Sequence, residues 1–411
     1  MRKLFLMLLC SSVLLLIGAI PAFAATGQND YPIVLLHGWT GWGRDELLGF
    51  KYWGATGDIE EALNDSGYTT YTAVVGPISS NWDRACELYA YIKGGTVDYG
   101  KVHSEKYGHA RYGRTFPGLY REWGTLDEND QIRKIHIIGH SMGGQTARVL
   151  VQLLTQGSDE EKNGTPAGDL SPLFSGGKNW VCSVTSISTP HDGTTLADMA
   201  DFIPNTGQLL GALAALVGTS SDNTFYDLKM DQWGLKRKSG ESMNDYLNRV
   251  FESSIWKDNN DVSNWDLSTD GARELNSWVK AQPDVYYFSW STEATFKDPL
   301  TGHQVPELNM NPLFSIFSIA MGSYTSNKPG HVVVDKSWWQ NDGVVNTRSM
   351  AGPSTDDIVK FNGTPVKGKW NNMGVVNSFD HMDIVGLTKS KTETYNWYRA
   401  RAALLASLPK D

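Results

Sequence analysis

The chain has 411 residues, of which 45 are acidic and 36 basic, and its formal net charge of −9 excludes functions that depend on a strongly basic surface, such as nucleic-acid binding. Hydrophobic residues make up 40% of the sequence and aromatic residues 11%, which is enough to bury a large core. A single α/β domain with insertions fits this length better than two unrelated domains.

Residues 1–24 have the pattern of a secretory signal peptide. Arg2 and Lys3 precede a long apolar run, and Ala22-Phe23-Ala24 is a small-residue cleavage motif. A membrane anchor is the alternative, but the short run and the cleavage motif favour removal. We therefore predict a secreted protein without a permanent membrane anchor, whose mature chain, residues 25–411, keeps a charge of about −11.

Two cysteines, Cys86 and Cys182, remain in the predicted mature chain. In an exported protein a pair of cysteines can form one disulfide bridge. Two isolated buried thiols fit the sequence equally well, because cysteine is among the residues most often found in protein cores.

Short apolar runs rich in β-branched residues alternate along the chain with segments of helical periodicity. This alternation predicts a mostly parallel sheet with helices on both faces, and it places ligands at the carboxyl ends of the strands. The predicted elements are strands at 31–36, 69–75, 181–188 and 285–290, helices at 59–63 and 273–280, and a strand-turn-helix unit at 135–154.

Three regions depart from this alternation. Residues 76–118 are rich in Gly, Tyr and His and are predicted to be an irregular insertion, and residues 155–179 are predicted to be a polar surface loop. A further stretch, 201–218, is either a core-facing helix or a lid over a site for water-insoluble substrates. Its apolar stripe consists of Leu209, Leu210, Leu213, Leu216 and Val217.

The unit at 135–154 contains a Gly-x-Ser-x-Gly pentapeptide centred on Ser141. Such a turn between a strand and a helix holds its serine exposed at the tip, and glycines two positions to either side relieve backbone crowding. We predict that Ser141 is a nucleophile. The backbone N–H groups of Met142 and of Trp39, which follows the first strand, are the predicted donors to a developing oxyanion.

A serine nucleophile needs a histidine base, and in this class of fold the chain order is serine, acid, histidine. Three histidines, His303, His331 and His381, follow Ser141 in usable positions, and His381 is preferred because it lies in a polar loop near the C-terminus. His191 precedes any suitable acid and is therefore excluded.

Asp342 is the preferred acid because it lies between the serine and His381 in a polar turn that leads into a β-branched run. Asp-Gly is also a common turn-former, so a purely structural role is the alternative. Asp335 is the nearest rival.

Six longer motifs together resemble the secreted lipases of Bacillus, Geobacillus and Staphylococcus, and most of all the thermoalkalophilic branch known as family I.5. The resemblance covers nearly the whole mature chain. It implies an α/β-hydrolase fold, a helical lid within about 201–235, and a nucleophile, acid and base at Ser141, Asp342 and His381. The motifs begin at His37, Ser80, Gly139, Thr189, Asp231 and Asn341.

The resemblance also implies a structural zinc ion that ties the insertion at 76–118 to the region after the lid. The matching ligand positions are Asp83, His103, His109 and Asp231. Two carboxylates and two imidazoles suit zinc as a closed four-coordinate ion.

A calcium site of the family is matched only at Gly302 and Asp383. The Asp-Pro pair expected at 388–389 is replaced by Thr388-Lys389. A lysine is unfavourable beside a divalent cation that needs several oxygen ligands, so we expect calcium to be weakly bound or absent.

The residues and the resemblance together predict a secreted triacylglycerol lipase that acts on lipid esters at an oil–water interface. The alternatives are a carboxylesterase for soluble short-chain esters and a non-catalytic binding protein with the same fold. The sequence gives no oligomeric state.

Overall fold

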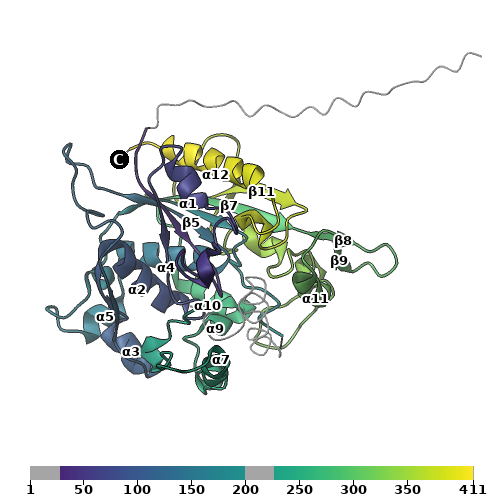
Figure 1. Ribbon diagram of the computed structural model, residues 1–411, viewed down its shortest axis with the longest axis horizontal. Helices are drawn as coiled ribbons and strands as arrows, with labels where there is room; N and C mark the ends of the chain where they lie inside the picture. Colours follow the sequence, from purple (N-terminus) through teal and green to yellow (C-terminus); the bar gives the residue numbers. More distant parts are fainter. Residues whose placement is uncertain (1–27, 200–225, 411) are drawn as a thin grey trace, which may run out of the picture.

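The computed structural model describes residues 28–199 and 226–410. It is built around a seven-stranded, fully parallel sheet with the strand order β10-β11-β7-β6-β5-β1-β2 (Figure 1). The predicted parallel α/β architecture is therefore confirmed. The strands of the sheet are β1 (Ile33–Leu36), β2 (Thr70–Ala73), β5 (Ile135–His140), β6 (Val181–Ile187), β7 (Tyr286–Glu293), β10 (Ile358–Lys360) and β11 (Trp370–Asn377).

Helices cover both faces of the sheet, and Figure 1 shows α1 and α12 on one side and α2, α4 and α10 on the other. Successive side chains of β1 enter two separate cores, since Leu35 packs with the α12 side and Leu36 with the α4 side. The helices are α1 (Ile59–Asn64), α2 (Asn81–Lys93), α3 (Lys101–Tyr107), α4 (Met142–Gln156), α5 (Asp159–Gly164), α7 (Met243–Phe251), α8 (Ile255–Asp258), α9 (Ser263–Leu267), α10 (Thr269–Trp278), α11 (Pro312–Met321) and α12 (Lys391–Ala406).

The prediction of an irregular insertion at 76–118 was wrong. This region contains the 13-residue helix α2 and the shorter α3, and two strands, β3 (Gly95–Asp98) and β4 (Tyr112–Phe116), that form an antiparallel pair. Helix α2 begins at the cap Ser80, whose hydroxyl accepts the N–H of Asp83, and packs its apolar side chains against α4. The many Gly, Tyr and His residues concealed this helical pattern.

The predicted surface loop at 155–179 is also partly structured, because it includes the short helix α5. Cys86 and Cys182 are both buried and are not joined by a disulfide bridge, so the thiol alternative is the correct one. The segment 201–218 and residues 1–24 lie outside the described residues. Within the described part, none of the helices is long and apolar enough to cross a bilayer.

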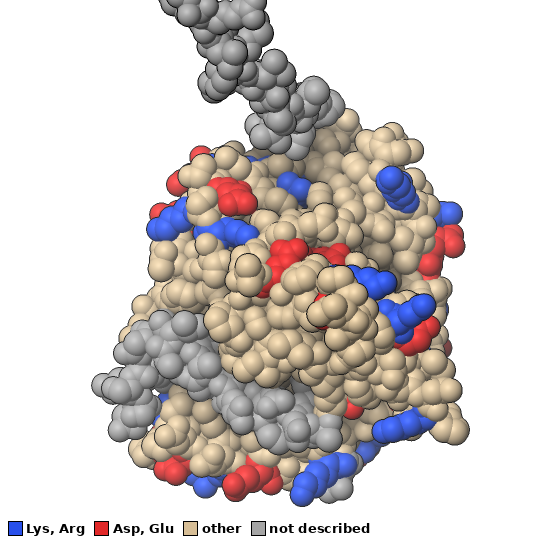
Figure 2. Space-filling view, turned by 90° about the vertical axis from the view of Figure 1, so that its right-hand side faces the viewer, with Lys and Arg blue, Asp and Glu red and all other residues tan. Residues whose placement is uncertain are grey.

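A hairpin of β8 (Thr295–Lys297) and β9 (Gln304–Pro306), together with α11, projects from one side of the molecule. Figure 2 looks at this side, where uncharged residues cover much of the surface between scattered charges. Helix α11 has no charged residue, and several large apolar side chains of this region are exposed. They are Phe296, Leu300, Leu308, Ile316 and Ile319.

Candidate active site and metal centre

Ser141 lies in the tight turn between β5 and α4, at the carboxyl edge of the sheet. Its backbone has φ 56° and ψ −131°, a conformation that is strained for a residue with a side chain. The turn closes only because its neighbours are glycines: a Cβ on Gly139 would lie 2.6 Å from the carbonyl carbon of Gly143, and one on Gly143 would lie 2.4 Å from the oxygen of Leu36. The predicted strand-turn-helix unit is present.

The structure brings His381 and Asp342 together. The Nδ1 atom of His381 lies 2.8 Å from Oδ2 of Asp342, and the His381 N–H donates to the Asp342 carbonyl at 2.9 Å. Both side chains are almost completely buried. The His381 ring lies 4.7 Å from the ring of His140, the residue directly before Ser141.

Asp342 is held as a carboxylate acceptor by three further donors. Thr292, at the carboxyl end of β7, donates its hydroxyl to Oδ2 at 2.7 Å. The backbone N–H groups of Val344 and Val345 donate to Oδ1 at 3.1 and 2.9 Å. These bonds fix the plane of the carboxylate that faces His381.

The alternative acids and bases lie elsewhere and have other partners. Asp335 is exposed and caps a short helical turn by accepting the N–H of Ser337. His331 is exposed and paired with Asp270, and His303 lies in the β8–β9 hairpin against Trp339. His191 is fully buried, with its Nε2 atom 2.9 Å from the Ser186 hydroxyl.

The loop after β1 approaches the serine closely. A Cβ on Gly38 would lie 2.6 Å from the Ser141 Cβ and 3.1 Å from its Oγ, so only glycine fits there. Trp39 is the next residue in this loop. Met142 is the first helical residue of α4, and the first N–H groups of a helix have no intrahelical acceptor.

Arg84 of α2 stabilises the loop after β1 through buried hydrogen bonds. Its guanidinium is fully buried and donates to the carbonyl oxygens of His37 at 2.6 Å and Gly76 at 2.8 Å, and to the Thr146 hydroxyl at 2.8 Å. Burial lowers the pKa of Arg84 to about 10. No pattern in the sequence predicts this role for Arg84, because a single arginine within a helix usually faces solvent.

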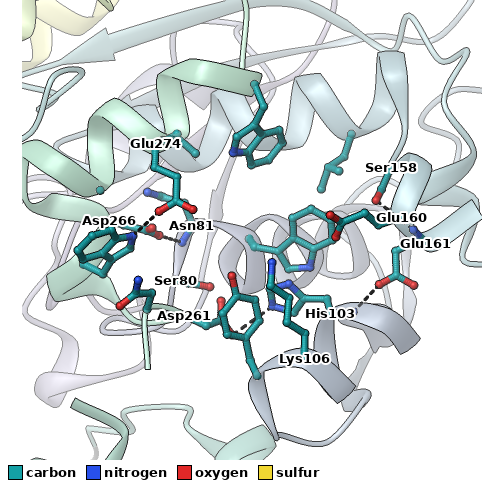
Figure 3. A pocket seen from close by; sticks show the side chains of 18 of the residues that line it. Ser80, Asn81, His103, Lys106, Ser158, Glu160, Glu161, Asp261, Asp266 and Glu274 are labelled. Atoms are coloured by element: carbon teal, nitrogen blue, oxygen red, sulfur yellow. Dashed lines mark hydrogen bonds and ion pairs between the residues drawn. The ribbon is translucent and has the colours of Figure 1, made fainter. Parts of the chain in front are cut away.

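A second group of polar side chains lies beside a cavity of about 450 Å³ between α2, α3, α5 and α10 (Figure 3). The described residues that line this cavity include His103 and Asp261 but none of Ser141, Asp342 and His381. The cavity is therefore separate from the serine site, and it reaches the histidine-carboxylate cluster described next.

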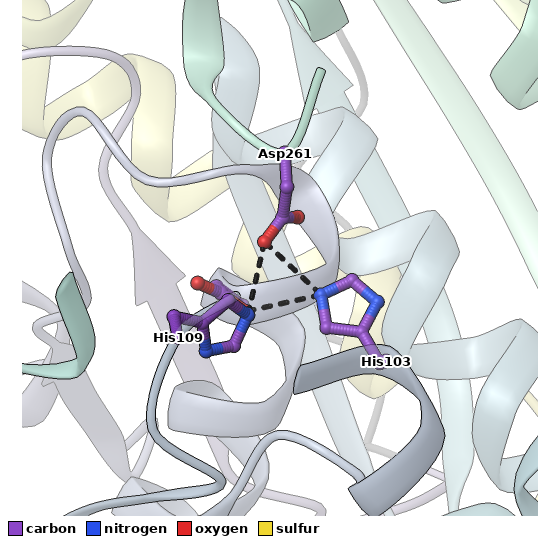
Figure 4. A group of neighbouring side chains, drawn as sticks. His103, His109 and Asp261 are labelled. Atoms are coloured by element: carbon purple, nitrogen blue, oxygen red, sulfur yellow. Dashed lines mark hydrogen bonds and ion pairs between the residues drawn. The ribbon is translucent and has the colours of Figure 1, made fainter. Parts of the chain in front are cut away.

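Two histidines and two aspartates form this cluster, which we call the metal cluster: Asp83, His103, His109 and Asp261. Each offers one ligand atom, and these atoms lie within 4.8 Å of one another. The Oδ2 atom of Asp261 is 3.1 Å from His103 Nε2 and 3.2 Å from His109 Nε2, and Figure 4 shows this carboxylate directed at both rings.

The residues of the metal cluster fit a bound cation. The Asp83 Oδ1 and His109 Nε2 atoms are buried and make no hydrogen bond of good geometry within the described protein, although His109 Nε2 lies 3.2 Å from Asp261 Oδ2. Unpartnered buried polar atoms are costly unless a ligand satisfies them. Other contacts fix the orientation of the two imidazole rings. The ring of Trp82 stacks on that of His103 with a centroid distance of 4.7 Å, and His109 Nδ1 donates to the Ala110 carbonyl at 2.9 Å.

The structure does not bring Asp231, the predicted fourth ligand, into the metal cluster. Both of its carboxylate oxygens are engaged by Arg114, at 2.8 Å from Nε and 2.7 Å from Nη2. The next residue, Gln232, is the one that reaches the cluster, by donating to Asp83 Oδ2 at 2.8 Å. No spacing in the sequence distinguishes Asp261 from other loop aspartates, so only the tertiary structure reveals it.

The structure shows what surrounds Asp383 and Gly302, the two positions that match the calcium site of the family. Asp383 accepts a hydrogen bond from the Thr388 hydroxyl, and its Oδ2 lies 3.4 Å from the Lys389 ammonium. Gly302 lies in the turn of the β8–β9 hairpin. Lys389 thus supplies positive charge at the carboxylate, and the weak or absent calcium site stays a prediction.

The chain matches the family described as "Lipase-like, C-terminal domain" over residues 29–404. It belongs to this family. The resemblance to bacterial lipases is thereby confirmed at the level of the family, and the parallel sheet with its serine turn is that of an α/β-hydrolase.

Individual relatives agree with this membership. The chain is 38% identical to lipase 1 of Staphylococcus aureus over 375 residues, which is 89% of this chain and 52% of that protein. It therefore spans about half the length of the curated staphylococcal relatives that it matches. Among solved structures, lipase 1 from Pelosinus fermentans is 57% identical with a TM-score of 0.86 (92% of this chain, 99% of that one). Staphylococcus hyicus lipase is 36% identical with a TM-score of 0.77 (93% and 97%).

Proposed function

We propose that this protein is a secreted triacylglycerol lipase in which Ser141, His381 and Asp342 form the catalytic triad. The observation that carries the proposal is the hydrogen bond of 2.8 Å between His381 Nδ1 and Asp342. Because Nδ1–H donates to the carboxylate, Nε2 of His381 is the basic nitrogen, available to take the serine proton. Membership of a lipase family supports the choice of substrate.

The reaction proceeds in two halves. The Ser141 hydroxyl gives its proton to His381 Nε2 while Oγ attacks the ester carbonyl, and the oxyanion accepts hydrogen bonds from the N–H groups of Met142 and Trp39. Collapse of this intermediate breaks the ester bond, and His381 returns the proton to the departing alcohol. Water then attacks the acyl-enzyme by the same route and releases the fatty acid.

The exposed apolar side chains near the site support a lipid substrate. Helix α11 packs against the acid loop, since a Cβ on Gly343 would lie 2.6 Å from the Phe314 Cβ, and the Asn311 N–H donates to Asp380, which precedes His381. On the outer side of the same helix, Ile316 is 68% exposed and Ile319 57%. An uncharged apolar surface beside the site favours contact with an oil droplet.

A structural zinc ion is part of the proposal. Asp83, His103, His109 and Asp261 would hold it through two imidazole nitrogens and two carboxylate oxygens, which matches the usual ligands of a closed zinc site. The metal cluster joins α2 and α3 to the loop before α9, so an ion there would stabilise this part of the fold rather than take part in ester hydrolysis.

The test compares wild-type protein with Ser141→Ala on a long-chain triglyceride emulsion and on a soluble short-chain ester, below and above the solubility limit of each. A lipase hydrolyses the emulsion with a rate that rises across that limit, and Ser141→Ala abolishes both activities while the fold is kept. Hydrolysis of the soluble ester alone would make the protein a carboxylesterase. An active Ser141→Ala variant would refute the triad.

A further inference from the structure

A buried chain of three hydrogen bonds connects the loop after β1 to the main chain of His381. The Gly38 N–H donates to the Tyr52 hydroxyl oxygen at 3.0 Å, and that oxygen lies 2.6 Å from His140 Nδ1. His140 Nε2 in turn lies 2.9 Å from the carbonyl oxygen of His381. Tyr52 is 5% exposed and His140 is fully buried, so no solvent competes for these bonds.

The direction of every bond in this chain follows from its two ends. A backbone carbonyl can only accept, so His140 Nε2 carries a proton and donates it to the His381 oxygen. In a neutral imidazole Nδ1 is then an acceptor, and the Tyr52 hydroxyl donates to it. The Gly38 N–H can only donate, so it fills a lone pair of the Tyr52 oxygen.

His140 must be neutral for this arrangement, and its surroundings keep it so. Burial holds the pKa of His140 well below its usual range, and the neighbouring His381 lowers it further. If both ring nitrogens of His140 carried a proton, Nδ1–H would point at the Tyr52 hydroxyl. The Tyr52 oxygen would then have to accept this hydrogen bond with its remaining lone pair, so the bond between Tyr52 and His140 would run in the opposite direction.

One end of the chain lies beside the proposed nucleophile, and the other end belongs to the proposed base. Gly38 is in contact with the Ser141 side chain, and His381 is the proposed base. A shift at either end would therefore change the geometry of attack, to which reaction rates are very sensitive.

We propose that Tyr52 and His140 are positioning residues that hold the oxyanion loop and the catalytic histidine in a fixed mutual arrangement around Ser141. The inference rests on the proposed esterase chemistry of the triad. Neither residue touches the reacting atoms, and both act through the backbone groups of Gly38 and His381.

The experiment measures kcat and KM for a soluble short-chain ester in Tyr52→Phe. Removal of the hydroxyl leaves the Gly38 N–H and His140 Nδ1 unpartnered in a buried place, and we expect kcat to fall about tenfold or more while KM stays within about twofold. Tyr395→Phe is the matched control. Its hydroxyl also accepts a backbone N–H, that of Asp58 at 2.8 Å, but it takes no part in the three bonds that join Gly38, Tyr52, His140 and His381.

His140 provides an independent second test. We expect His140→Gln, which keeps an amide donor and an acceptor, to retain more activity than His140→Leu. In the double variant Tyr52→Phe/His140→Leu, a chain that works as a unit predicts no greater loss than in the more impaired single variant. The inference would be overturned if the losses of the two single variants multiplied in the double variant, or if His140→Gln and His140→Leu were equally active. It would also be overturned if Tyr52→Phe had the same kcat as Tyr395→Phe.

The outcomes also separate this inference from the proposed function. Wild-type protein that hydrolyses the ester, together with an inactive Ser141→Ala variant and an unaffected Tyr52→Phe variant, would overturn only the positioning roles. A wild-type protein without ester hydrolysis would overturn both.

Discussion

Nε2 of His103 lies 3.1 Å from Oδ2 of Asp261, although the two residues are 158 positions apart in the chain. This contact places one carboxylate of the metal cluster on the loop before α9. The carboxylate of Asp231, by contrast, lies outside the cluster and forms an ion pair with Arg114.

Asp261→Asn is therefore expected to lose bound zinc, and Asp231→Asn is expected to keep it. The first change replaces a charged ligand by a weak neutral one, whereas the second leaves Arg114 paired with Asp227 at 2.8 Å. Elemental analysis of the purified proteins should give about one zinc per chain in wild type and Asp231→Asn. Thermal unfolding of Asp261→Asn should begin several degrees lower, by roughly 1 °C for each kcal/mol lost in a chain of this length. The opposite ranking of the two variants would contradict the assignment.

Asp342→Asn should reduce kcat for ester hydrolysis by a factor of roughly 10⁴, because an amide cannot stabilise the imidazolium and favours the wrong histidine tautomer. Asp335→Asn is the matched control, since this carboxylate caps an exposed helical turn. Steady-state kinetics on a soluble ester separate the two. A large loss in Asp335→Asn with full activity in Asp342→Asn would reverse the choice of acid.

Arg84→Lys should lower both stability and kcat. A lysine ammonium cannot reproduce the three directed bonds that the guanidinium makes to His37, Gly76 and Thr146, and the loop carbonyls would lose their partners. Each unpaired buried group costs about 1–3 kcal/mol in the free energy of unfolding. Denaturant unfolding and kinetics measure the two effects. The control is Arg399→Lys, a half-buried arginine whose Nε donates to the Ser66 hydroxyl at 2.8 Å.

Glu87→Gln should change how stability depends on pH. Burial raises the pKa of Glu87 from its ordinary 4.5 to about 7, and the charge of Asp83 adds to this, while hydrogen bonds from Gly76 and Tyr99 and the charge of Arg84 oppose it. Between these two pKa values the native state binds more protons than the unfolded state. The contribution of Glu87 to the free energy of unfolding therefore falls as pH rises through that window, and it is constant above it.

Glutamine does not titrate, so the variant should gain stability relative to wild type across the same window. Urea unfolding at about pH 5, 6, 7 and 8, with equal metal content in both proteins, measures the difference. Glu122→Gln, at an exposed position, is the matched control for the change from glutamate to glutamine. A Glu87→Gln difference that is independent of pH would show that the native carboxyl titrates normally.

The sequence by itself determined most of what depends on local pattern. The alternation of apolar runs and helical periodicity specified the parallel sheet, because a strand buried on both faces must be apolar throughout. The strained turn at Ser141 was recognisable because only glycine permits the close approaches at positions 139 and 143. The order of serine, acid and histidine then selected Asp342 and His381, which the structure brings within 2.8 Å of each other.

Only the tertiary structure decided which side chains meet across long separations. Asp261, Arg84, Tyr52 and His140 occupy unremarkable places in the sequence, and their roles arise from burial beside partners that come from other elements. A buried polar atom must find a partner wherever the fold offers one, and that partner is set by packing and not by spacing along the chain. For this reason the resemblance pointed to the region in which the metal cluster lies, whereas its fourth member became evident only when the loop before α9 was seen beside His103 and His109.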